Sequence, residues 1–574
     1  MKLFNKYIIM TMACVVSITT VAQENEEENE LNGGTITVVK PYDPTISDAF
    51  KVKSVPAIND TTQVKKKPVT YSIFSVPVAS TFTPAKGKLS TRKKTERAKF
   101  FDNYARLGLG NYVNVLAEFA GNIEIDKDTD FGVFLNHFSS QGGIDEVVFN
   151  DAFSDTSLDL SYGKRNRGMS YGITAGGRFQ SANWYGAPQG TGLIPDDDID
   201  VGTNYLTLGL GGKAQFFDSA IEQIDLQLFN TGSNYDASET QITLRPEFGF
   251  DIMEEEIGLG ATVDYLTGVF DNQDFLSSDY SFLNLGVNPS INLYGDRFKA
   301  ELGAGINYLS DLENSEGQIY VYPDINASYI LVDEKVMAFT TIGGGLDMNS
   351  LRGFADENMF IAPALVVTPT NRQLDAQLGI KGKLSENFGY KVYGGYRLEE
   401  DRGLFVKNPF AFTDPSSAQP YQFGNTFSVA YGDLNTFTFG GALSVDVNSQ
   451  FNLTLNAASL SYDVSNGDDF NNVASQLPSF TADLIGNYDI TDQWNVGATL
   501  YYVGERDVFT NALAATTTLD SFLDLNLDVN YKINPKLTAF LRGHNLTGGN
   551  YQYYLDVPVQ NLQILGGAVY KFDF

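Results

Sequence analysis

The stretch SFLDLNLDVNYKI, residues 521–533, alternates in polarity along most of its length. Successive side chains of a β-strand point to opposite sides, so an extended chain here would have one apolar and one largely polar face. The apolar face comprises Leu523, Leu525, Leu527, Val529 and Tyr531, and the other face Phe522, Asp524, Asn526, Asp528 and Asn530. The apolar face would meet a second sheet in a soluble sandwich, or lipid in a membrane barrel whose polar face lines water. Alternation alone leaves both architectures open.

The connections between such segments separate the two architectures. Outer-membrane barrels have short turns at the periplasmic end and longer loops at the extracellular end. With both termini periplasmic, the short turns all share one end: 534–536, 491–493, 448–450, 385–389, 332–335, 294–297, 253–256, 215–220, 164–168 and 126–130. Longer extracellular connections are then expected at 547–560, 506–520, 464–478, 399–435, 347–372, 309–317, 268–282, 231–239, 180–202 and 139–154. This parity favours a membrane barrel.

Two further segments resemble strands but break the parity. NTFSVAYGDLN (425–435) and NMFIAPALVV (358–367) would each move the short turns to the wrong end if they spanned the membrane, so we expect both inside extracellular loops. With first strands near 104–110 and 114–125, the sequence predicts an all-β, antiparallel transmembrane β-barrel of about 22 strands. Such a barrel has a radius on the order of 20 Å, which is too wide to fill with its own side chains.

The first 22 residues have the pattern of a secretory signal peptide. Lys2 and Lys6 precede the apolar run YIIMTMACVVSITTV, and Thr20 and Ala22 occupy the small-residue positions, so we expect cleavage after Ala22. A membrane anchor and a lipoprotein modified at Cys14 are the alternatives, but the run is short for a membrane helix and continues past Cys14. Because Cys14 is the only cysteine, the mature chain has no disulfide and no thiol nucleophile.

Charge divides the mature chain near Phe100. An acidic leader, ENEEENE at 24–30, is followed between Lys40 and Lys99 by 13 basic and 4 acidic residues. From Phe100 onward the balance reverses to 61 acidic and 24 basic residues. We therefore expect three parts: a signal peptide at 1–22, a mostly irregular basic arm in the periplasm or lumen at 23–100, and an outer-membrane barrel at 101–574.

Composition leaves open whether the arm is a solvated tail or packs on the acidic barrel. If it packs, its cations would pair with carboxylates of the lumen or rim and occlude the pore. These cations are Lys65, Lys66, Lys67, Arg92, Lys93, Lys94 and Arg97.

No set of residues forms a catalytic constellation, so we expect neither an enzyme nor a cofactor. His137 and His544 are the only histidines and fall near the extracellular ends of the third and twenty-first strands. Four strand spacings separate these strands around the closure, or roughly 20 Å. The two histidines therefore cannot act on one substrate atom, and each is expected to form hydrogen bonds within the wall.

Other ligand-binding motifs are weak. Asp196, Asp197, Asp198 and Asp200 lie in one extracellular loop and are the candidate calcium ligands, but the spacing lacks the glycine and the final glutamate of an EF-hand loop, which favours a solvated loop. The glycines of LGLGGK (208–213) fall within an expected strand, so they do not form a phosphate cradle. The barrel is too acidic to bind nucleic acid.

The last residues, HNLTGGNYQYYLDVPVQNLQILGGAVYKFDF (544–574), resemble the closing hairpin of TonB-dependent receptors. Asn545, Leu546 and Tyr551 are followed by a loop and a final alternating strand that ends at Phe574. The 22 expected strands match the barrel of that family, whose lumen is plugged. The departure lies at the other end, since the arm is shorter than the family's globular plug.

The resemblance implies an outer-membrane transporter or channel of a Gram-negative bacterium. Gating by the N-terminal arm is our own hypothesis from its charge. The resemblance also implies that Tyr570, Phe572 and Phe574 form the signal read by the barrel-assembly machinery. The strand parity places their side chains toward lipid. TITVV, comprising Thr35, Ile36, Thr37, Val38 and Val39, resembles the box by which such receptors engage TonB through strand addition, although an ordinary β-prone tail has the same composition. The alternative function is a non-conducting structural or accessory subunit, in which the arm docks a periplasmic partner.

Overall fold

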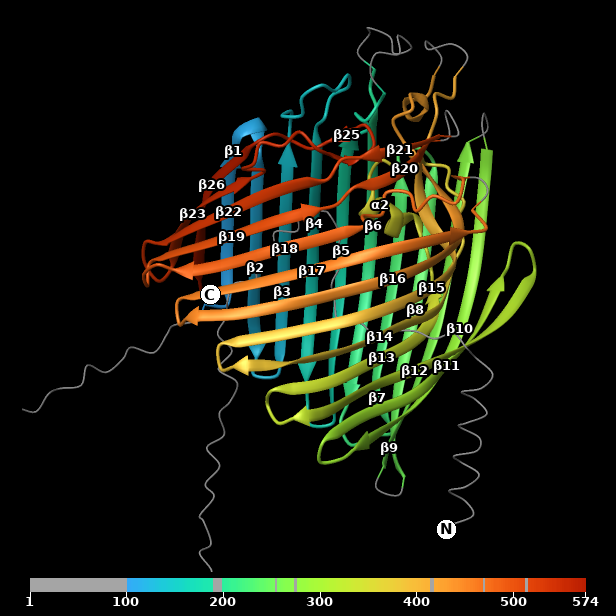
Figure 1. Cartoon of the computed structure of the whole chain (residues 1–574), viewed down its shortest axis with the longest axis vertical. Coiled ribbons are helices and arrows are strands. Elements are labelled where there is room, and N and C mark those ends of the chain that lie inside the picture. The colour runs from blue at the N-terminus through green and yellow to red at the C-terminus, as the bar shows by residue number, and fades with distance from the viewer. Residues whose placement is uncertain are drawn as a thin grey trace, which may run out of the picture. The chain divides into compact units, whose positions relative to one another are not determined.

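A computed structural model describes residues 101–188, 199–252, 255–272, 276–412, 418–467, 470–510 and 515–573. Within these residues, 22 strands form a closed antiparallel barrel (Figure 1). Each strand of the wall pairs with its neighbours in chain order, and the last strand pairs with the first. The predicted fold class and strand number are confirmed.

The wall strands have the following bounds. The first eleven are β1 (Asn103–Gly110), β2 (Val115–Asp126), β3 (Thr129–Ser140), β4 (Phe153–Arg165), β5 (Met169–Asn183), β6 (Gly202–Phe216), β7 (Ile221–Ser233), β8 (Ala237–Ile252), β9 (Glu255–Asn272), β10 (Leu276–Tyr294) and β11 (Phe298–Asp311). The other eleven are β12 (Glu316–Val332), β13 (Val336–Asp347), β14 (Thr370–Ser385), β15 (Phe388–Lys407), β16 (Phe427–Asn448), β17 (Phe451–Ser465), β18 (Phe480–Asp489), β19 (Trp494–Val503), β22 (Phe522–Lys532), β23 (Leu537–His544) and β26 (Gln563–Phe572).

The remaining elements lie in the connections. They are the 3-10 helices η1 (Asn111–Val113) and η3 (Pro420–Gln422), the helix α2 (Leu351–Glu357), and the short strands β20 (Arg506–Thr510), β21 (Ala515–Leu519), β24 (Gln552–Tyr554) and β25 (Val557–Pro558). No helix in the described part of the chain is long and apolar enough to cross a membrane.

The closure joins β26 to β1 along the whole length of β1. The antiparallel register runs from Asn103 opposite Phe572 to Gly110 opposite Leu565. β26 also pairs with β23, so the terminal strand is bonded on both edges. A closed barrel leaves no free strand edge at this seam, as lipid requires.

Strand β22 has the two faces that its sequence predicts. Asp528 Oδ1 lies 2.7 Å from Arg542 Nε, and Asp524 accepts a hydrogen bond of 2.8 Å from the Tyr551 hydroxyl, so the polar face points inward. Leu523, on the other face, is 44% exposed. Exposed apolar side chains form a band around the outer wall, including Leu158, Leu160, Ile173, Leu208, Leu210, Leu226, Leu285, Leu378, Val392 and Leu541. This arrangement is that of a transmembrane barrel.

Short turns and long loops segregate to opposite ends of the barrel, as the parity predicts. Each of the ten expected short turns coincides with a connection at the end where β1 begins, which is the periplasmic end. At the extracellular end, however, the connections at 234–236 and 312–315 are only tight turns, and β9 continues to Asn272 while β10 begins at Leu276. The predicted longer loops 231–239, 268–282 and 309–317 are therefore wrong. The strand tips extend further because the inward side chains of Phe270, Tyr280 and Phe282 are buried in a core above the lumen.

The placement of 358–367 in a loop is confirmed, whereas that of 425–435 is wrong. Most of the latter segment is the first part of β16, paired with β15 from Lys407 opposite Phe427 onward. It adds no spanning strand, so the parity is unaffected, but it lengthens β16 beyond the wall. The extension is stable because both faces are covered: Phe405 and Phe427 are buried on one cluster, and Leu404 and Val406 on another.

Candidate functional site: a cap over the extracellular mouth

Five long connections pack together at the extracellular end, and we call this structure the cap. Its segments are 141–152, 184–201, 348–369, 408–426 and 545–562, of which 189–198 and 413–417 lie outside the described residues. Strands β5 and β15 are ten positions apart in the barrel of 22, so the segments that follow them start from nearly opposite sides. Contacts between these segments therefore span the mouth.

Helix α2 is anchored to the inner wall through its first turn. The Ser350 hydroxyl caps the helix by accepting from Gly353 N at 3.0 Å. Glu239 on β8, which is 3% exposed, accepts from Leu351 N at 2.6 Å and Arg352 N at 3.2 Å. A carboxylate at this position satisfies two of the free N–H groups of the helix and complements its dipole.

Charged side chains of α2 extend the anchorage to other strands. Arg352 donates to Gln241 Oε1 at 3.1 Å, and its guanidinium lies 4.0 Å from the centre of the Phe229 ring. Asp356 pairs with Arg178 on β5 at 2.8 Å. The helix comes from the β13–β14 connection, so these contacts tie it to the facing wall.

An aromatic core joins the other cap segments. Trp184 and Phe423, both fully buried, come from the β5–β6 and β15–β16 connections. Trp184 Nε1 donates to Met359 O at 2.9 Å, and Asn425 Nδ2 donates to Trp184 O at 3.0 Å. The ring of Phe149, from the β3–β4 connection, packs edge-on against Phe423 at 5.7 Å. Four of the five cap segments therefore share one core.

A buried lysine links the fifth segment to this core. Lys407, at the end of β15 and 3% exposed, donates to Gly186 O at 2.6 Å and to Leu555 O at 3.0 Å. Its ammonium lies 3.6 Å from Asp556 Oδ2. Burial lowers the pKa of Lys407 to about 8, with Asp556 opposing that effect. One side chain thus holds three chain segments together.

A second buried cation fixes the β23–β26 connection from the other side. Arg506, on β20 and 5% exposed, donates through Nη2 to Gln552 O at 2.7 Å and through Nη1 to Tyr553 O. Neighbouring Tyr554 is buried against Phe405 and Phe427, and burial raises the pKa of its hydroxyl. The cap is therefore a packed aromatic core whose segments are also joined by hydrogen bonds from buried cations.

Below the cap, the inner wall of β13–β15 carries paired charges. Arg372 Nη2 lies 2.9 Å from Asp347 Oδ1, Arg397 pairs with Asp375, and Arg402 Nη1 lies 3.6 Å from Glu399 Oε1. These pairs line the lumen because apolar residues between them, such as Leu378 and Val392, face outward. A solute moving along the lumen would meet fixed charges of both signs.

The histidines lie where the sequence predicts. His137 makes hydrogen-bond contacts with Thr156 Oγ1 at 2.8 Å and Ser139 Oγ at 3.1 Å, and His544 with Asn526 Oδ1 at 3.1 Å. Their strands, β3 and β23, are four positions apart in the barrel. The structure does not bring them together, and the expected hydrogen bonds within the wall are confirmed.

The roles predicted for most of the other candidate residues remain predictions. Several of these residues lie outside the described residues: the signal peptide, the box-like segment Thr35–Val39, the arm cations, Asp196, Asp197, Asp198 and Phe574. Asp200 is described, and its Oδ1 accepts from Gly202 N at 2.9 Å. The described residues contain no group of three or more His, Cys, Asp or Glu side chains that could hold a metal ion. Tyr570 and Phe572 stack at 5.8 Å on the terminal strand.

The sequence did not reveal the cap, although a signal was present. The apolar run at 358–367 and the aromatic residues of 408–426 sit in extracellular connections, where solvated loops would be polar. Ile361 and Phe423 are fully buried in the structure. Aromatic and aliphatic residues inside a loop thus indicated that the loop was packed.

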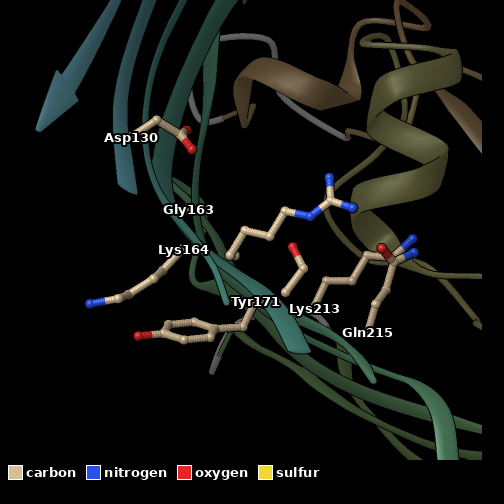
Figure 2. Close-up of a pocket in the computed structure, with 9 residues that line it drawn as sticks. Asp130, Gly163, Lys164, Tyr171, Lys213 and Gln215 are labelled. Atoms are coloured by element: carbon tan, nitrogen blue, oxygen red, sulfur yellow. The ribbon is translucent and has the colours of Figure 1, made fainter. Parts of the chain in front are cut away.

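A separate polar pocket of about 340 Å³ lies near the periplasmic end (Figure 2). Figure 2 shows Lys213 and Gln215 pointing to one side of the sheet and Lys164 and Tyr171 to the opposite side, with Asp130 beyond Gly163. The pocket is lined by Asp130, Gly163, Lys164, Arg165, Ser170, Tyr171, Gly172, Lys213 and Gln215. It belongs to the wall and not to the cap.

Neither a protein-family model nor a curated protein sequence matches the chain. Solved structures do match. The ferric-catecholate import receptor Fiu of E. coli K12 is 10% identical, with a TM-score of 0.59 over 83% of this chain and 82% of that one. The ferric enterobactin receptor PfeA of Pseudomonas aeruginosa is 11% identical, with a TM-score of 0.60 over 83% and 82%. The copper transporter OprC is 12% identical, with a TM-score of 0.58 over 82% and 80%.

These likenesses concern the fold. The barrel resembles those of TonB-dependent receptors, as the closing hairpin predicts.

Proposed function

We propose that this chain is an outer-membrane transporter of a Gram-negative bacterium that moves a solute through its 22-strand barrel. The observation that carries the proposal is the combination of a barrel with the fold of metal-uptake receptors and a lumen lined by paired charges below a folded cap. A lumen of this width leaks unless another part of the chain occludes it, because its own side chains cannot fill it. The structurally similar proteins are transport receptors, and no enzymatic step is part of the proposal.

Two barriers would act in series along the path. The cap lies at the extracellular end, and the basic arm, residues 23–100, would act at the periplasmic end or in the lumen by pairing its lysines and arginines with carboxylates. Individual exposed ion pairs contribute little, but an array on one tether benefits from effective concentration. The segment Thr35–Val39 would add a strand to TonB or to another periplasmic protein.

Conductance in planar bilayers tests the proposal. The proteins to compare are the mature chain, a variant lacking residues 24–100, a variant in which residues 408–426 are replaced by a tight turn, and the combination of both changes. Because the barriers are in series, each single change should raise single-channel conductance modestly and the combination should raise it most. A combined variant that is folded but conducts no more than the parent would refute the transporter proposal.

A second candidate function follows from the rigidity of the cap. Trp184, Phe423 and Ile361 are fully buried between opposite sides of the mouth, so opening would expose a hydrophobic core. Such a permanent closure suits a non-conducting structural or accessory subunit that holds a periplasmic partner through its arm. Purification in mild detergent discriminates the two: a stoichiometric partner lost on deleting residues 24–100, with no conductance, would favour the accessory role.

A further inference from the structure

The turn between β4 and β5 carries an unusual concentration of positive charge. The sequence GKRNRG (163–168) has three basic residues in six positions and no acidic one. Other turns at the same end, such as MEEE at 253–256 and DEK at 333–335, contain acidic residues. We call Arg165, Arg167 and nearby Lys213 the basic site; Lys164 is excluded because side chains alternate along β4 and Lys164 lies on the opposite face of the sheet from Arg165.

Register explains why the basic site adjoins a hollow. Asp130, Gly163, Gly172 and Lys213 lie directly opposite one another on four successive strands, β3 to β6. The two central positions have no side chain, and a Cβ at Gly172 would meet only Tyr162 O at 3.9 Å. In the row toward the turn, Arg165, Ser170 and Gln215 are likewise paired in register. The result is a polar pocket on the face that carries Arg165 and Lys213. Lys164 and Tyr171 point to the opposite side of the sheet from Lys213 (Figure 2).

The cations of the basic site are available for an external partner. In the described part of the chain, no ion pair engages Arg165, Arg167 or Lys213. The Arg165 guanidinium lies 5.5 Å from the centre of the Phe217 ring, which positions it at the pocket. Asp130 is the one carboxylate among the pocket's described lining residues, and Asp225 faces Lys213 on β7. The cationic side chains of the basic site therefore favour an acidic ligand that binds away from the Asp130 carboxylate.

We propose that the basic site binds the acidic leader of the same chain, residues 24–30. The leader has five glutamates in seven residues, and it directly follows Gln23, the first mature residue if cleavage follows Ala22. The barrel as a whole has a net negative charge, which disfavours binding of the leader elsewhere on its surface. Charge complementarity thus assigns the leader to this site, independently of whether the barrel transports a solute.

Chain length permits the contact. The described chain starts at Phe101 beside β1, at the same end of the barrel as the basic site. Three or four strand spacings, about 15–20 Å, separate β1 from the β4–β5 turn. About 70 residues connect Glu30 to Phe101, and a flexible coil of that length has an end-to-end distance on the order of 45 Å. The leader therefore reaches the site without stretching the segment between them.

Distances between paired spin labels test the proposal in the full-length protein. Cys14 is the only natural cysteine and lies in the expected signal peptide, so introduced cysteines are labelled specifically. One label goes on Glu27→Cys and the other on Asn166→Cys in the β4–β5 turn. The matched control places the second label on Asn387→Cys, in the β14–β15 turn ten strands away. Docking predicts a narrow, short distance for the first pair and a longer one for the control.

Charge neutralisation identifies the contact. Arg165→Gln with Arg167→Gln, or glutamine in place of the five leader glutamates, should each broaden the short distance, and combining them should add nothing further. Salt at 1 M should have the same effect, because exposed charges are screened. Heat-modified migration on gels confirms that each variant is folded. Equal, broad distances for both label pairs, or a short distance unaffected by neutralisation, would overturn the proposal.

Discussion

At the residue scale, Lys407 decides how the cap responds to pH. Its pKa in the closed cap is about 8, below the ordinary value near 10.5, because the ammonium is buried. An opened cap would expose the side chain and restore the ordinary pKa, so between these values the open state binds more protons. Linkage then requires the closed cap to gain stability as pH rises through that window. Asp556 is the charged group facing the ammonium.

A single tryptophan can report this change. The chain has two tryptophans, and Trp184 is fully buried in the cap while Trp494 is 42% exposed. In a Trp494→Phe background, the urea midpoint of Trp184 exposure should rise between pH 7.5 and 9.5. Lys407→Met should lower the midpoint, because two carbonyls lose their donor, and should flatten its pH dependence. An equal slope in both proteins would show that another group titrates.

Glu239 is a second residue on which the cap depends. It accepts hydrogen bonds from two backbone N–H groups of α2 and, at 2.7 Å, from the Tyr280 hydroxyl. Glu239→Gln replaces one carboxylate oxygen by an NH2 group, which would face the N–H and O–H donors that the carboxylate now accepts from. We expect the free energy of cap opening, measured in the same Trp184 assay, to fall by about 1–3 kcal/mol. Tyr280→Phe removes one partner only and should cost about 1 kcal/mol. A loss for Glu239→Gln no larger than that for Tyr280→Phe would contradict the role of Glu239 as the helix anchor.

At the scale of the elements, the terminal strand is both a structural part and an expected assembly signal. β26 closes the barrel against β1, and Tyr570 and Phe572 stack near its end. If the terminal aromatic residue is read by the assembly machinery, Phe572→Ser should sharply reduce the heat-modifiable, folded fraction in the outer membrane. Tyr488→Ser is the matched control, since Tyr488 is a 42% exposed aromatic residue near the periplasmic end of β18. Equal losses for the two variants would mean that the effect is general lipid-face destabilisation.

The elements that the sequence predicted are those whose signals are local. Alternating polarity indicates strands such as β22, and Asn and Pro indicate turns such as 534–536. The order and number of strands could therefore be derived from the sequence. The lengths of strands above the membrane could not, because they depend on packing against distant segments. β16 extends to Phe427 only because the cap buries that ring.

The cap itself was beyond prediction for the same reason. Its decisive contacts join residues that are far apart in sequence, such as Lys407 with Gly186, and Trp184 with Met359. Nothing in a single sequence fixes which of several loops meet. The apolar content of 358–367 indicated burial but not the partner.

At the scale of the whole molecule, the barrel and the cap should behave as separable units. The wall is closed by its own hydrogen-bonded ladder, whereas the cap depends on contacts among loops. Lys407 and Phe427 are directly opposite each other, so a two-residue Asn-Gly turn can replace residues 408–426 without moving β15 or β16.

This replacement removes Phe423 and Asn425, the partners of Trp184, and should leave the barrel folded while opening the cap. We expect unchanged heat-modified migration together with strong acrylamide quenching of Trp184 in the Trp494→Phe background. Exchanging the β11–β12 turn at 312–315 for another tight turn is the control, because that turn lies outside the cap segments and should leave Trp184 protected. Loss of the folded barrel on replacing 408–426 would show that the cap is needed for assembly, and a still-protected Trp184 would show that the other loops close the mouth without it.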